Sequence, residues 1–147
     1  MELLHLIVSS FIGTCVMTSF SYMISESFGQ MYREPALLGY IIQRLNITVS
    51  DRLKNLLGWA LHYATGIIFT LCFLPIWISQ GVTVANTLIM GTFAGIAGIL
   101  SWMVAFRLSP EKPKIDYLGY YAQLFVAHFL FTAGASFAWS ATQCMFE

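Results

Sequence analysis

The sequence predicts an all-α, polytopic membrane protein with four transmembrane helices and a short interfacial helix between the first and the second. Three observations support this prediction. Of the 147 residues, 58% are hydrophobic and only 10% are charged, which leaves too little polar surface to cover a water-soluble globule of this size. The apolar residues form four long runs, and the basic residues occur in only two of the gaps between those runs.

Each apolar run is long enough to cross a membrane as a helix. The predicted spans cover residues 3–24, 53–78, 82–106 and 117–143 and make a single four-helix domain. Roughly 20 helical residues cross the hydrocarbon core of about 30 Å. Helices are required because the bilayer offers no water to unpaired backbone groups. The short turn after residue 78 predicts that the second and third spans are antiparallel neighbours.

The segment between the first two spans predicts the interfacial helix, over residues 35–46. Pro35 suits the first turn of a helix, because its missing N–H would have no partner there. Apolar side chains then recur at helical spacing: Leu37, Leu38, Ile41, Ile42 and Leu45. A helix with one apolar face is expected along the headgroup boundary. Residues 46–50 should end it, and Ser50 can cap the second span.

The positions of the charged residues predict the orientation. The seven basic residues are Arg33, Arg44, Arg52 and Lys54 in the first gap and Arg107, Lys112 and Lys114 in the third. Lys and Arg near the ends of spans are retained in the cytoplasm, so both gaps should face it and both termini should lie outside. Seven acidic residues balance the bases, which argues against a nucleic-acid partner.

Small and hydroxyl side chains predict how the spans pack. Gly91, Gly95 and Gly98 form a ridge on the third span, where another helix can approach closely. We favour packing inside one subunit, and a homo-oligomer interface is the alternative. The first span carries a stripe of hydroxyl groups that should face other helices: Ser10, Thr14, Thr18, Ser21 and Ser25.

Two histidines within the spans are the main candidates for a ligand site. A polar ionisable group in hydrocarbon normally faces the interior of the bundle, where it pairs, binds or relays a proton. His62 shares a helix face with Gly66, and His128 shares one with Tyr121 and Thr132. Counting from the nearest charges puts the two rings at depths of roughly 12 and 18 Å, so they can share a cavity in the cytoplasmic half.

Four interpretations of this pair stay open. The first is that each imidazole only hydrogen-bonds a neighbouring helix. The second is haem held by His62 and His128, with a slot lined by small residues such as Gly66. The third is a divalent metal held by the same two histidines, and the fourth is a proton or substrate relay in a transporter. The last would need a water-accessible path along Ser10, Thr14 and Thr18.

Charged residues flank the cytoplasmic ends of the first two spans. Glu26, Arg33 and Glu34 follow the first span, while Asp51, Arg52 and Lys54 precede the second. We expect solvated ion pairs here, which contribute little to stability. The basic members can also hold anionic lipid headgroups, at about 1 kcal/mol each.

Several short stretches resemble a family of small bacterial inner-membrane proteins that is described as a domain of unknown function. The stretches are Gly13-Thr14 with Met17-Thr18, Leu57-Gly58-Trp59-Ala60-Leu61-His62-Tyr63-Ala64-Thr65-Gly66-Ile67, and Ala127-His128-Phe129. The resemblance spans most of the chain and implies four spans and a bacterial inner membrane, but no established reaction. It also implies an acidic residue where this chain has Thr18.

The sequence therefore predicts an integral inner-membrane protein that binds a small ligand, lipid or cofactor in a cavity around His62 and His128, with Gly66, Tyr121 and Thr132 nearby. A small transporter or channel subunit is the first alternative. The second is a structural membrane protein without a ligand site. No nucleophile–base pair or metal triad points to an enzyme.

Overall fold

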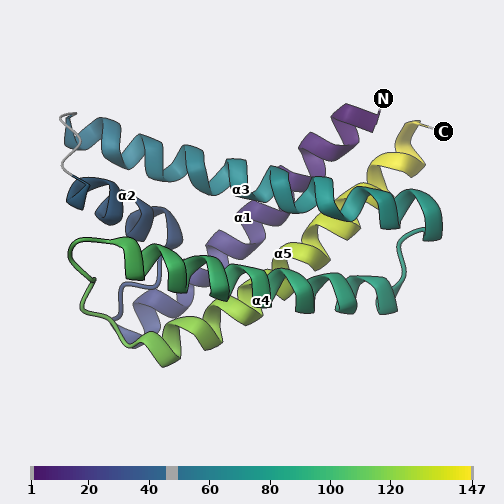
Figure 1. The fold of residues 1–147 in the computed structure, drawn as a ribbon. Helices are drawn as coiled ribbons and strands as arrows, with labels where there is room; N and C mark the ends of the chain where they lie inside the picture. Colours follow the sequence, from purple (N-terminus) through teal and green to yellow (C-terminus); the bar gives the residue numbers. More distant parts are fainter. Residues whose placement is uncertain (1, 46–49, 147) are drawn as a thin grey trace.

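The computed structural model describes residues 2–45 and 50–146, and these residues form helices and no strand. The helices are α1 (Glu2–Phe28), α2 (Glu34–Arg44), α3 (Asp51–Gln80), α4 (Val84–Leu108) and α5 (Tyr117–Phe146) (Figure 1). Four of them are long and apolar enough to cross a membrane. The predicted all-α architecture, with a short helix between the first two long ones, is confirmed.

The helices begin and end at residues whose local chemistry explains the boundaries. The Ser50 hydroxyl accepts a hydrogen bond from the Leu53 N–H at 3.3 Å and caps α3, as predicted. Gly29 and Gly81, with φ of 61° and 70°, follow the last residues of α1 and α3. All four long helices extend two to four residues past the predicted C-terminal ends of the spans, whereas α4 begins two residues later than predicted because the Thr83 side chain caps it. Residues 46–49, where we predicted the end of the interfacial helix, lie outside the described residues.

The two ends of the bundle differ in charge. The N-terminus, the C-terminus and the α3–α4 turn lie at one end, while α2 and the α4–α5 connection lie at the other (Figure 1). Both basic gaps are therefore at the same end, as a shared membrane side requires. The Arg44 guanidinium lies 2.8 Å from the Glu111 carboxylate and joins the two segments there.

Helix α5 is at the centre of the bundle. It packs along both α1 and α4, while α3 packs along α1 and carries α2 on its first half. Tyr120, Leu124, Ala127 and Ala135 of α5 are completely buried. Helices α3 and α4 are antiparallel, but they scarcely contact each other. The predicted antiparallel arrangement is present, but few backbone contacts join the two helices, because a short turn fixes only their adjoining ends.

The glycine ridge of α4 faces α5. A Cβ atom built at Gly91 would lie 2.8 Å from the Phe129 ring, and one at Gly95 would lie 2.5 Å from the Phe125 ring. A Cβ atom at Gly98 would clash with the His128 ring. These glycines therefore let α4 approach α5 closely, which is packing inside one subunit.

Candidate functional site

A cavity of about 160 Å³ is lined by residues of all five helices. Its polar lining includes His62 of α3, His128 of α5 and Glu34 of α2. Its apolar lining includes Phe69 and Phe131. The structure thus brings the two histidines singled out from the sequence to one cavity, together with a carboxyl group.

Two hydroxyl groups mark the side of the cavity between α3 and α4. Thr65 and Ser101 line the cavity and are also exposed on the surface of the bundle. Each hydroxyl donates to a carbonyl of its own helix, Thr65 to Leu61 and Ser101 to Ala97, both at 2.8 Å. Because α3 and α4 scarcely contact each other, we call the gap between Thr65 and Ser101 the cavity mouth. In a membrane this mouth faces lipid.

His62 is held by the hydroxyl stripe of α1. Its Nε2 lies 2.8 Å from the Thr18 hydroxyl oxygen, which in turn lies 2.6 Å from the Thr14 carbonyl. The carbonyl can only accept, so the single Thr18 proton is donated to it. Nε2 of His62 must then carry the hydrogen that it donates to Thr18. In the neutral ring, Nδ1 is left as an acceptor.

His128 is held by its own helix. Its Nδ1 lies 2.8 Å from the Leu124 carbonyl oxygen and must donate to it, because a carbonyl only accepts. Nε2 is then the acceptor of the neutral ring. The residue is 4% exposed, and its ring packs edge-on against Phe69, with ring centroids 5.3 Å apart. Both histidines line the cavity, and each neutral ring has one acceptor nitrogen that these hydrogen bonds do not use.

Glu34 is the site residue that the sequence analysis missed. We expected it among solvated charges, but only 1% of the residue is exposed. Its Oε1 accepts hydrogen bonds from the Ser21 hydroxyl at 2.6 Å and from the Gln123 amide at 3.2 Å. Its Oε2 has no hydrogen-bond partner among the described residues. Burial raises the pKa of this carboxyl to about 7, against the opposing effect of those hydrogen bonds.

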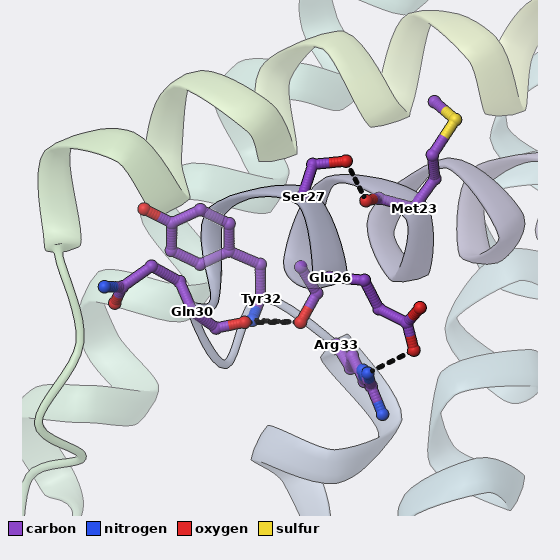
Figure 2. Close-up of polar contacts among 7 residues, drawn as sticks. Met23, Glu26, Ser27, Gln30, Tyr32 and Arg33 are labelled. Atoms are coloured by element: carbon purple, nitrogen blue, oxygen red, sulfur yellow. Dashed lines mark hydrogen bonds and ion pairs between the residues drawn. The ribbon is translucent and has the colours of Figure 1, made fainter.

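The basic neighbour of Glu34 does not compensate its charge. Arg33 points to Glu26 of α1, with Nη2 and Oε1 3.0 Å apart (Figure 2). Its guanidinium also lies over the Tyr22 ring, 4.7 Å from the centroid. This pair is the solvated ion pair that we expected. After α1, the Arg33 side chain therefore points to the surface and the Glu34 side chain points into the bundle.

The hydroxyl stripe of α1 faces the bundle interior, as predicted. All five of its members are buried: Ser10, Thr14, Thr18, Ser21 and Ser25. Thr18 contacts His62 and Ser21 contacts Glu34, so the stripe holds two of the cavity's polar groups. Of the three residues suggested for a water path, Thr14 borders the cavity, whereas Ser10 and Thr18 are not in its lining.

Three of the five residues suggested for the ligand site line the cavity: His62, His128 and Gly66. Tyr121 and Thr132 do not. The Tyr121 side chain packs against Tyr117 and Tyr120 and borders a separate surface pocket. The Thr132 hydroxyl donates to the His128 carbonyl at 2.8 Å within α5. Both share a helix face with His128, but a helix face is wide enough to border two different neighbours.

The cavity does not fit the metal or haem interpretations. Among the described residues, no group of three His, Cys, Asp or Glu side chains is arranged to hold a metal ion. Haem is larger than the drug-sized ligands that need roughly 300 Å³ or more. Nε2 of His62 is also engaged by Thr18. An apolar cavity of about 150 Å³ holds a molecule such as benzene, which is the scale of this site.

Comparisons with protein-family models, with curated proteins and with solved structures found no match to this chain.

Proposed function

We propose that this protein is an integral membrane protein that binds a small, largely apolar molecule in the cavity whose mouth lies between α3 and α4. The observation that carries the proposal is the combination of polar and apolar groups in one lining. Glu34, His62 and His128 form its polar part, while Phe69 and Phe131 belong to its apolar part. A concave apolar site with a few convergent polar groups is the usual form of a small-molecule site.

The mouth at Thr65 and Ser101 supports entry from the lipid phase. Both residues are exposed on helix faces that also carry large exposed apolar side chains, including Leu61 and Ile68 of α3 and Val104 and Leu108 of α4. A molecule dissolved in the bilayer meets this surface first. The hydroxyl groups at the rim already donate within their own helices and therefore offer little resistance to an apolar molecule.

Replacing Ser101 by Phe should close the mouth and abolish binding. The test is saturation-transfer NMR with benzyl alcohol, on the purified protein in phosphatidylcholine nanodiscs, where the Ser101→Phe signal should fall to the level of empty nanodiscs. Ala97→Phe is the matched control, because Ala97 is exposed on the same helix and does not line the cavity. Equal signals from wild type, Ser101→Phe and empty nanodiscs would exclude a binding cavity.

We also propose that the protein resides in a bacterial inner membrane with both termini outside the cytoplasm. The support is the resemblance noted above and the gathering of the basic gaps at one end of the bundle. Alkaline phosphatase, which is active only outside the cytoplasm, should be active when fused to the C-terminus. It should be inactive when inserted between Ser109 and Tyr117. The reverse pattern would overturn this orientation.

A further inference from the structure

The polar groups of the cavity share one chemical property. The tautomers derived above leave Nδ1 of His62 and Nε2 of His128 as acceptors. Oε2 of Glu34 is a third acceptor, and no donor among the described residues pairs with it. The remaining hydroxyl groups of the lining, on Thr14, Thr65 and Ser101, donate to carbonyls of their own helices. Trp102 adds one indole N–H donor to the lining. The three acceptors still outnumber this donor, so the lining has a surplus of acceptors.

The cavity also lacks a basic side chain. No Lys or Arg belongs to its lining. Three of the basic residues are engaged elsewhere, Arg33 with Glu26, Arg44 with Glu111 and Lys54 with Asp51. An ionised Glu34 is thus a buried carboxylate without a cation, an arrangement that strongly favours a positively charged partner.

We propose that the ligand carries a protonated amine, which the Glu34 carboxylate binds with His62 and His128 as further hydrogen-bond acceptors. This inference rests on the proposed binding function and names the chemical class of its ligand. An ammonium group has hydrogen-bond donors and no acceptor, which matches the surplus in the lining. Its apolar part would lie toward Phe69 and Phe131. The amine comes either from a free lipophilic amine or from the headgroup of an aminophospholipid.

Three probes of similar size test the choice of ligand. Benzylamine, benzyl alcohol and benzoate share a ring that suits the cavity and differ in charge. At about pH 8, where a primary amine is protonated and Glu34 is largely ionised, wild type should bind benzylamine roughly tenfold or more tightly than benzyl alcohol. Benzoate should bind most weakly. Binding is measured by titration in phosphatidylcholine nanodiscs.

Glu34→Gln separates this inference from the proposed function. The variant keeps the side-chain oxygen that accepts from Ser21 and Gln123 but has no charge. It should lose the preference for benzylamine and still bind benzyl alcohol. Equal affinity of wild type for the amine and the alcohol would overturn the inference while leaving the cavity intact. Failure of every probe to bind would instead refute the proposed function.

The pH dependence of benzylamine binding identifies the group that binds the amine. Benzylamine affinity should rise about tenfold between about pH 6 and pH 8, as the carboxyl ionises around its pKa of about 7. The other titratable groups around Glu34 are His62 on α3, His128 and Tyr120 on α5, and Tyr22 on α1. Tyrosines are neutral in this range. A rise that persists in Glu34→Gln would assign it to the histidines and count against the inference.

A second arm distinguishes the two sources of the amine. The titration is repeated in nanodiscs that contain phosphatidylethanolamine, whose headgroup is a primary amine. Weaker apparent binding of benzylamine there, in wild type but not in Glu34→Gln, assigns the site to the lipid headgroup. Unchanged binding assigns it to a free amine.

Discussion

Replacing Glu34 by Gln is expected to make this protein more stable, and only at neutral and alkaline pH. In the folded chain the Glu34 carboxyl has a pKa of about 7, against an ordinary value of 4.5. The folded state therefore keeps a proton that the unfolded state releases at lower pH. Wild-type stability falls as pH rises from about 4.5 to about 7 and is constant above that window, with a total loss of about 3 kcal/mol.

Thermal unfolding in detergent at about pH 5 and about pH 8 measures this difference. Wild type should have the lower midpoint at the higher pH, and Glu34→Gln should lose most of that decrease. The amide is neutral at both pH values and still accepts from Ser21 and Gln123 through its oxygen. Glu26→Gln is the matched control, since the Glu26 side chain is 74% exposed and pairs with Arg33 at the surface. Identical pH profiles for wild type and Glu34→Gln would show that the Glu34 carboxyl is solvated.

The architecture could be predicted from the sequence because lipid imposes strong rules on it. An apolar run of sufficient length must be helical, and each of the four runs is a helix in the structure. The hydroxyl stripe of α1 is buried and the glycines of α4 lie against α5, and both patterns can be recognised in the sequence because they repeat at helical spacing. The meeting of His62 with His128 in one cavity follows from similar depth on helices that run in the same direction.

Glu34 was missed because it was interpreted from its position in a charged gap. A signal was present, since Glu34 precedes Leu37, Leu38 and Ile41 by three, four and seven residues and so shares their apolar helix face. Leu37 on that face is completely buried, and Glu34 itself contacts Ser21 of α1 and Gln123 of α5. The separation of α3 from α4 had no such signal. It depends on how all the helices pack around α5, which a local pattern does not contain.

The contact between α2 and α3 should be the most sensitive point of the cavity, because two backbones meet there. A Cβ atom at Gly58 would lie 2.5 Å from the Pro35 carbonyl oxygen and 2.9 Å from the Gly39 nitrogen. Both are backbone atoms of α2, so no side-chain rotation can relieve the clash. Glu34 directly precedes Pro35, and therefore a displacement of α2 at this point also displaces the carboxyl from Ser21 and Gln123.

Gly58→Ala should therefore lower the unfolding free energy by about 2–3 kcal/mol, although alanine is the better helix former by about 1 kcal/mol. Thermal unfolding measures the loss. Gly39→Ala is the matched control on the opposite side of the same contact. There the nearest atom to an added Cβ is the Asn55 side-chain oxygen at 3.2 Å, and the nearest backbone atom is 3.8 Å away. A small side-chain shift accommodates this methyl group, so Gly39→Ala should be nearly neutral.

The pH profile of Gly58→Ala then tests whether α2 sets the environment of Glu34. If the added methyl group moves α2 away from α3, water reaches the carboxyl and its pKa returns toward the ordinary value. The decrease in stability between about pH 5 and pH 8 should then shrink in Gly58→Ala and persist in Gly39→Ala. A destabilised Gly58→Ala that keeps the full wild-type decrease would contradict this coupling. It would mean that Ser21 of α1 and Gln123 of α5 hold Glu34 in place without the contact between α2 and α3.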